Sequence, residues 1–329
     1  ALRRRQKLLF VRTPLAYYAG LSPAERASCL RRRFAAMLAS GTGWWLTASS
    51  ADELALPGLT AELENYARIQ KQEADRRQPA RAEIAFVLDP DVHGMFVPRE
   101  GGFATADRLQ RATAPRYAAP RASELFYLLG LPRTAWSRIG AAVDVVFIDD
   151  LRPAEYKLVV FFHTIRLNPA RRARIRALQG DGRVLVWLWA DGCNTGRELS
   201  NAATVELMRL PVRLTGRQVR LFMQPTVRLG RLPGLTAIAG YFGQSVSARE
   251  PRRGLARTTA PALVVDGADA NTLATYLDWP EAGALAVFEH RHWTVVYSAS
   301  PALNPEVLRA LARKAGVHVV LDHNDQFFC

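Results

Sequence analysis

Residues 184–190 read Val-Leu-Val-Trp-Leu-Trp-Ala, and the polar turn Asp191-Gly192-Cys193-Asn194 follows at once. This run is apolar on both faces of an extended chain and is short enough to be a buried strand. Residues 156–164 (YKLVVFFHT) repeat the pattern. Strands of this kind are typical of a parallel sheet that helices cover on both faces.

Segments with helical character separate these strands from their neighbours. Pro169 to Leu178 lies between the two strands, and Asn304 to Ala315 has Pro305 in its first turn and Gly316 as its stop. The alternation predicts an α/β fold, a flavodoxin-like sheet of about five parallel strands flanked by helices. We also expect strands at Glu83 to Asp89, Val143 to Ile148 and Val317 to Leu321, a hairpin at Ala284 to Glu289 and Thr294 to Ser298, and irregular β additions within residues 200–265.

The N-terminal part of the chain is richer in helical pattern. Residues 22–40 predict a helix with Ser22 as its N-cap, and residues 60–76 predict a second helix. The apolar run Trp44 to Leu46 between them predicts a strand. We also expect one helix at residues 123–131, beyond a long loop at 90–120. The sequence thus divides into an α-rich N-terminal segment, residues 1–80, and an α/β domain, residues 81–329.

Composition describes a globular chain and leaves its compartment open. Of the 329 residues, 49% are hydrophobic and 22% charged, which permits a sizeable core and argues against disorder. No apolar run approaches the roughly 18–20 residues that cross a bilayer, and Arg12 and Pro14 interrupt any signal-peptide pattern. The three cysteines are scattered, so neither a disulfide framework nor a CxxC zinc site is predicted. Since no methionine begins the chain, we expect a segment of a longer protein.

The net charge of +14 comes almost entirely from arginine, because only four of the 44 basic residues are lysine. Such a charge is interpreted either as a stripe that binds phosphate backbones or as arginines spread over solvated helix faces. The clusters lie in separate predicted elements, which favours the second interpretation. Nucleic acid is therefore not an expected partner. The clusters are residues 31–33, 76–77, 171–176 and 252–253.

An ordered set of segments resembles one family, the class I glutamine amidotransferase-like domain that follows the catalytic barrel in β-galactosidase-like glycoside hydrolases. This domain is also called the β-galactosidase trimerisation domain. Upstream of it, residues 41–46 (GTGWWL) resemble the last strand of the (β/α)8 barrel in such enzymes. No single motif is diagnostic, and the order of the set carries the resemblance. The segments are residues 82–89 (AEIAFVLD), 144–151 (DVVFIDDL), 156–162 (YKLVVFF), 183–192 (RVLVWLWADG), 293–301 (WTVVYSASP) and 308–325 (LRALARKAGVHVVLDHND).

The resemblance implies a non-catalytic accessory or oligomerisation domain of an enzyme that acts on carbohydrate, preceded by the tail of its barrel within residues 1–80. Carbohydrate would bind through barrel units outside these 329 residues. A homo-oligomer is expected, and no cofactor is implied. Trp44 and Trp45 would form a sugar-stacking wall in a complete barrel, although at least one of them is expected in the core.

The carboxylates that a glycosidase needs are not evident. Retaining enzymes use two of them about 5 Å apart on late barrel strands. Glu53, Glu62 and Glu64 fall instead in a predicted loop and helix, where solvated surface explains them. The sequence therefore predicts an incomplete catalytic site.

Cys193 supports a rival interpretation, a stand-alone amidotransferase-like hydrolase. Such enzymes place a cysteine on a sharp turn after a strand and draw a histidine from later in the chain. Cys193 follows the 184–190 strand, and His318 is the candidate base. The local sequence Ala-Asp-Gly-Cys-Asn is not G-x-C-x-G, however, and no His-x-Glu pair follows. A degenerate site fits this context better.

Two further patterns predict sites. His290 and His292 at a hairpin tip would offer two imidazoles to a metal ion, or would lie in solvent. Aspartates end the predicted parallel strands, at the edge where open α/β sheets bind ligands. They would form a ligand pocket there, as in a non-catalytic binding module, or cap nearby helices. These aspartates are Asp89, Asp149, Asp150 and Asp191.

Overall fold

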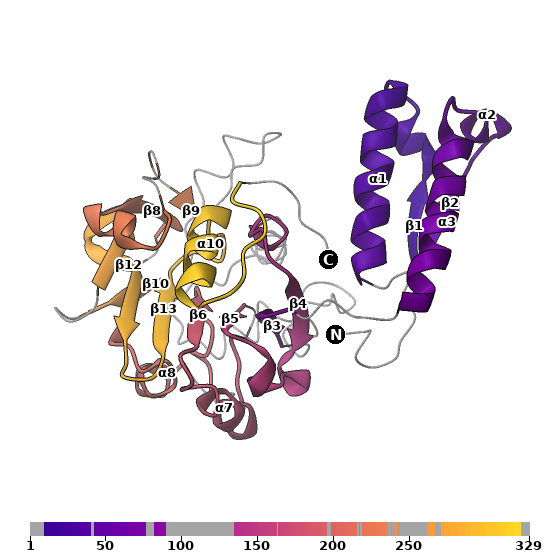
Figure 1. The fold of residues 1–329 in the computed structure, drawn as a ribbon. Coiled ribbons are helices and arrows are strands. Elements are labelled where there is room, and N and C mark those ends of the chain that lie inside the picture. Colours follow the sequence, from indigo (N-terminus) through magenta and orange to yellow (C-terminus); the bar gives the residue numbers. More distant parts are fainter. Residues whose placement is uncertain are drawn as a thin grey trace, which may run out of the picture. The chain divides into compact units, whose positions relative to one another are not determined.

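The computed structural model divides into two compact units, with the division after residue 81. The unit from residue 82 onward is an α/β fold, as predicted (Figure 1). The helix expected at 123–131 and the loop expected at 90–120 lie outside the described residues. The structure describes residues 10–40, 43–76, 82–89, 135–162, 164–195, 199–215, 217, 219–235, 238, 240, 242–243, 262–266 and 271–323.

The first unit is built around two parallel strands. β1 (Phe10–Pro14) pairs with β2 (Gly43–Thr47), and α1 (Pro23–Ser40) connects them. α2 (Ala51–Leu54) and α3 (Leu59–Arg76) follow β2. The core of the unit is a cluster of buried apolar side chains from these elements and the 3-10 turn after β1: Leu15, Tyr18, Leu30, Phe34, Leu59 and Tyr66.

The start of α1 shows why this helix forms where the sequence predicts it. The Glu25 N–H donates to Ser22 Oγ at 3.4 Å, and the Glu25 carboxylate accepts the Ser22 N–H at 3.0 Å. This reciprocal capping box satisfies donors that the first turn leaves without helical partners.

The second unit contains a mixed sheet with a parallel core. The core strands lie in the order β4-β3-β5-β6-β13, which in chain order reads 2-1-3-4-5, the flavodoxin-like order. β5 and β6 are buried along their whole length, as their two-sided apolar sequences predicted. The strands are β3 (Ile84–Leu88), β4 (Val143–Phe147), β5 (Leu158–Phe161), β6 (Val184–Leu188) and β13 (Thr294–Ser298).

Antiparallel strands extend this core on one side. β13 pairs with β12 (Trp279–Glu289) in the predicted hairpin. β11, β8 and β9 continue the sheet, while β10 pairs with both β12 and β7. These are the β additions expected from the less regular sequence. Their bounds are β7 (Val212–Thr215), β8 (Phe222–Pro225), β9 (Phe242–Gly243), β10 (Ala262–Val265) and β11 (Asn271–Tyr276).

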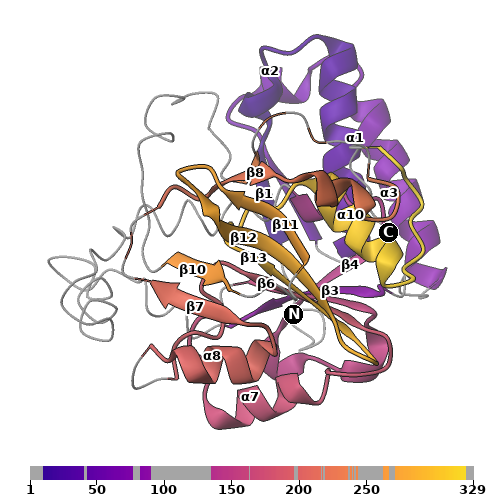
Figure 2. The same ribbon diagram turned by 90° about the vertical axis from the view of Figure 1, so that its left-hand side faces the viewer.

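Helices cover both faces of the sheet. α7 (Pro169–Arg176) and α8 (Asn201–Met208) lie on one face and α10 (Pro305–Lys314) on the other (Figures 1 and 2). The middle of α10 is buried on all sides, from Val307 to Ala312. Short 3-10 turns complete the unit at Ile148–Asp150, Pro153–Glu155 and Val227–Arg231.

The strand predicted at Val317 to Leu321 was wrong. These residues form no strand, and the N–H groups of Val320 and Leu321 both donate to the Gly140 carbonyl at 2.7 and 3.1 Å. Their apolar alternation resembles a strand, but β13 already occupies the parallel position beside β6.

Candidate functional site

Buried acidic residues gather at the carboxyl edge of the parallel sheet. In this strand order the topology switches between β3 and β5, and open α/β sheets bind ligands outside the carboxyl ends of such strands. Asp89 follows β3, Thr164 lies beyond β5, and Asp191 lies beyond β6. All three are at most 1% exposed. Asp89 and Asp191, two of the four aspartates predicted at this edge, therefore meet at the switch point.

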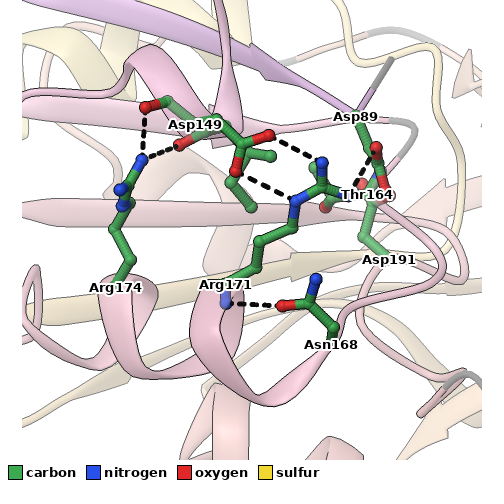
Figure 3. A network of polar contacts seen from close by, with 8 residues as sticks. Asp89, Asp149, Thr164, Asn168, Arg171, Arg174 and Asp191 are labelled. Atoms are coloured by element: carbon green, nitrogen blue, oxygen red, sulfur yellow. Dashed lines mark hydrogen bonds and ion pairs between the residues drawn. The ribbon is translucent and has the colours of Figure 1, made fainter. Parts of the chain in front are cut away.

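Arg171 lies at the centre of this cluster (Figure 3). Its Nη1 donates to Asp89 Oδ1 at 2.9 Å, and its Nε and Nη2 donate to the two carboxylate oxygens of Asp149 at 3.1 and 2.6 Å. Only 11% of the Arg171 side chain is exposed. Charge-assisted contacts of this kind offset part of the cost of burying the ions.

The beginning of α7 explains the position of Arg171. Asn168 is the N-cap, and its Oδ1 accepts the Arg171 N–H at 2.9 Å. A helix that follows a parallel strand begins at the carboxyl edge, so its first turn faces the switch point. The sequence interpretation missed Arg171, although the Asn-Pro start of the helix offered the signal.

Of the two adjacent predicted aspartates Asp149 and Asp150, it is Asp149 that pairs with Arg171. Both lie on the 3-10 turn after β4. Arg174, one turn further along α7, donates to the carbonyl oxygens of Ile148 and Asp149. This contact fixes the turn so that the Asp149 carboxylate meets Arg171.

Burial strongly shifts the pKa of Asp191. Its Oδ1 accepts the Thr164 N–H at 2.5 Å, while among the described residues its Oδ2 has no hydrogen-bond partner. Burial raises the pKa of Asp191 to about 8, despite the opposing hydrogen bonds from Thr164. At neutral pH the side chain is therefore mostly a neutral carboxylic acid.

This network occupies the place where an open α/β sheet binds its ligand. Arg171 meets the charge of Asp89 and Asp149, and Asp191 is largely uncharged. No group of three or more His, Cys, Asp or Glu side chains within the described ranges could hold a metal ion. Among the described residues, the cations of this cluster are thus engaged with its own carboxylates and carbonyl groups.

Cys193 does not occupy the sharp turn that a nucleophile needs. Trp189 follows β6 directly and has a φ of +49°, a conformation rare for a bulky residue. Cys193 comes four residues later and is 1% exposed. Burial raises the pKa of its thiol to about 12, so the nucleophilic thiolate is scarce.

Arg172 holds the loop around Cys193 in place. Its buried guanidinium donates to the carbonyls of Leu167, Gly192 and Ala203 at 3.2, 2.7 and 3.0 Å. Gly192 adopts a φ of +73°, which favours glycine. The glycine-bearing loop after β6 therefore has a structural role.

His318 lies away from Cys193. Its N–H donates to the Glu83 carboxylate at 3.1 Å, and Glu83 precedes β3 at the amino edge of the sheet. Cys193 lies beyond the carboxyl edge, and a strand of this length spans roughly 15 Å. The structure does not bring the two residues together.

His290 and His292 also do not converge. The His290 ring stacks on Trp293 at 4.3 Å, and its Nε2 lies 3.1 Å from the Arg209 carbonyl oxygen. His292 is exposed in the two-residue turn. The hairpin tip thus fixes one imidazole by packing and leaves the other in solvent.

Trp44 and Trp45 point to different environments. Trp44 packs with Phe34 and Tyr66 at ring distances of 6.2 and 5.8 Å, whereas Trp45 is 61% exposed. Trp44 is therefore partly buried against the core of the first unit, whereas Trp45 presents most of its surface to solvent.

The acidic residues of the first unit have local roles. Glu53 accepts the Ser49 N–H at 2.7 Å, Glu62 pairs with Arg31, and Glu64 is exposed. They form no carboxylate pair of the kind that glycoside hydrolysis needs.

Comparisons with known proteins find likeness in structure. No protein-family model matches the chain, and a sequence comparison with curated proteins finds no match. The structure resembles the β-galactosidase of Rahnella sp. R3, with 13% identity, a TM-score of 0.55 and coverage of 92% of this chain and 43% of that one. It resembles the β-galactosidase of Bacillus circulans sp. alkalophilus with 13% identity, a TM-score of 0.54 and coverage of 88% and 42%.

A GH42 β-galactosidase named Gan42B gives a similar result, with 15% identity, a TM-score of 0.51 and coverage of 92% and 42%. The chain thus has the fold of parts of GH42 β-galactosidases and spans less than half the length of these enzymes. None of the helices described here is long and apolar enough to cross a membrane.

Proposed function

We propose that this chain is a non-catalytic part of a β-galactosidase-like glycoside hydrolase. The second unit is an accessory or oligomerisation domain, and the first unit is the last part of a (β/α)8 barrel. The extent of the fold likeness carries the proposal. A match over 92% of the chain leaves 8% unaligned, whereas the first unit holds 83 of 329 residues, about a quarter. The likeness therefore includes most of both units.

The strands of the first unit support the assignment to a barrel. Within the described part of the chain, β1 and β2 pair only with each other, whereas each strand of a closed barrel has two neighbours. Trp44 packs toward the helices, and successive strand residues alternate between faces. Arg12 and Trp45 are opposite each other in register, and both are exposed. In a closed barrel this pair would face the interior, where carbohydrate binds.

The second unit supports a non-catalytic role through the contents of its switch point. The Arg171 network occupies the edge where a ligand would bind, and Cys193 is a buried thiol that lies away from the candidate base His318. The rival function is a hydrolase that uses Cys193 as its nucleophile. Such an enzyme needs a reactive thiolate on the sharp turn directly after the strand, and Trp189 lies on that turn. A homo-oligomer remains part of the proposal through the family resemblance.

Activity and size measurements test the proposal. The purified chain and its Cys193→Ser variant are assayed with glutamine and with a chromogenic β-galactoside, and we expect no turnover by either. Glutamine hydrolysis that disappears in Cys193→Ser would establish the rival function. Sedimentation equilibrium is expected to show a homo-oligomer, and a strictly monomeric chain would contradict the oligomerisation role.

A further inference from the structure

A surface hollow lies at the amino edge of the sheet, the edge opposite to the Arg171 network. Its volume is about 630 Å³, and its walls are residues 179–182, before β6, and residues 289–294, at the tip of the β12–β13 hairpin. This volume lies within the roughly 300–1,000 Å³ of small-molecule sites. The lining is more polar than apolar, which differs from the apolar lining usual in such sites.

The two walls are held together and are well ordered by local contacts. The Gly182 N–H donates to the His292 carbonyl at 2.7 Å, and the His290 N–H donates to the Trp293 carbonyl at 2.9 Å. The His290 ring stacks on Trp293 at a centroid distance of 4.3 Å, and the Phe288 ring lies tilted against His290 at 4.8 Å. The hollow therefore has an aromatic wall that needs little ordering when a ligand binds.

The floor of the hollow is open because two of its residues lack side chains. A Cβ at either Gly180 or Gly182 would meet no atom within 4 Å. Gly182 has a φ of +70°, a conformation that favours glycine. Gly180 has no such constraint, so a larger side chain fits there and projects into empty space.

The hollow offers hydrogen-bond acceptors. A carbonyl only accepts, so the Nε2 of His290 must carry the proton that it shares with Arg209. Burial lowers the pKa of His290, so the ring is neutral at neutral pH and its Nδ1 is an acceptor. Gln179 uses its amide N–H on the Leu207 carbonyl at 2.7 Å, which leaves its oxygen as a further acceptor.

Three charged residues line the hollow, the carboxylates of Asp181 and Glu289 and the cation of Arg291. The Asp181 carboxylate pairs with Arg183 at 2.9 Å, and the Glu289 carboxylate pairs with Lys314 at 2.6 Å. Both carboxylates remain largely exposed, at 79% and 68%, and each keeps lone pairs for further donors. With both carboxylates paired and Arg291 as a further donor, the hollow offers donors and acceptors to a ligand with many hydroxyl groups.

We propose that this hollow binds a neutral saccharide, with the His290–Trp293 stack against the sugar ring and the acceptors of Gln179, Asp181 and Glu289 toward its hydroxyls. Sugar rings present apolar C–H faces to aromatic side chains and hydroxyls around their rim. All residues that line the site belong to the second unit. The choice of a β-galactoside as the probe rests on the proposed function.

Saturation-transfer NMR with lactose and the full chain tests the proposal. We expect lactose to bind the wild type with a dissociation constant in the millimolar range, typical of a shallow site. Gly180→Phe fills the hollow and is expected to weaken binding more than about tenfold. His290→Phe keeps the ring stack but removes the acceptor, and we expect weaker binding there too.

Gly230→Phe is the matched control, because a Cβ at Gly230 also meets no atom within 4 Å and Gly230 lies outside the hollow. It is expected to bind lactose like the wild type. Lactose that does not bind the wild type, or that binds Gly180→Phe equally well, would overturn the proposal. These outcomes concern the hollow alone, whereas sedimentation and activity assays concern the proposed function, so either can fail without the other.

Discussion

Replacing Arg171 by methionine removes the cation that Asp89 and Asp149 share at the carboxyl edge of the sheet. The side chains of Arg171 and Asp89 are 11% and 1% exposed, and breaking a buried ion pair costs about 3–5 kcal/mol. Asp149 is 43% exposed, so its share is screened by solvent and amounts to about 0–1 kcal/mol. We therefore expect Arg171→Met to lower the free energy of unfolding by about 3–5 kcal/mol.

Urea unfolding followed by tryptophan fluorescence measures this loss, because Trp187 is fully buried in the same unit. Arg176→Met is the control on the same helix, since Arg176 and its partner Glu206 are 41% and 52% exposed and such pairs contribute about 0–1 kcal/mol. Adding Asp89→Asn to Arg171→Met is expected to recover part of the loss. Equal unfolding midpoints for Arg171→Met and Arg176→Met would refute the interpretation of the network as a buried, stabilising pair.

Three further predictions concern the loop after β6. Because the pKa of Asp191 is about 8 when folded and 3.8 in its ordinary state, the folded chain binds one more proton between these values. The free energy of unfolding should then fall as pH rises from about 4 to about 8, by up to about 1.4 kcal/mol per pH unit. Urea titrations of the wild type and of Asp191→Asn at several pH values measure this, and the free energy of the variant should depend less on pH. The same pH dependence in both proteins would contradict the prediction. Cys193 should resist a thiol reagent in the native chain and react only after unfolding, as read by peptide mass mapping, whereas rapid native labelling would show an accessible thiolate. Gly192→Ala should lower stability by about 1–3 kcal/mol, because its φ is +73° and the new Cβ lies 2.9 Å from Leu207 Cδ2. The Gly316→Ala control, with a φ of +70° and no atom within 4 Å, should lose less in thermal unfolding.

The parallel core could be predicted from sequence because its strands are buried on both faces. Every residue of β6 is buried, so the run is uniformly apolar and stands out. The 317–321 segment shows the limit of this reasoning. Its pattern also fits a strand, but the pattern does not say which segment pairs beside β6, and β13 has that position.

The candidate site was predictable only in part. Aspartates that end parallel strands must meet at one edge, which placed Asp89 and Asp191 together. The cation that pairs with Asp89 is the arginine of α7 that faces this edge. The helical periodicity of the sequence does not show which of the arginines in α7 that is. The sequence also does not specify which residue makes the sharp turn after β6. Cys193 was therefore considered as a nucleophile on that turn, whereas Trp189 is the residue that lies there.

The coding sequence immediately before Ala1 tests the central proposal most directly. If the first unit is the end of a catalytic barrel, the reading frame continues upstream through the earlier β/α units, with two glutamates at the carboxyl ends of barrel strands. A start codon beside Ala1, with no barrel encoded before it, would contradict the assignment and leave a stand-alone protein.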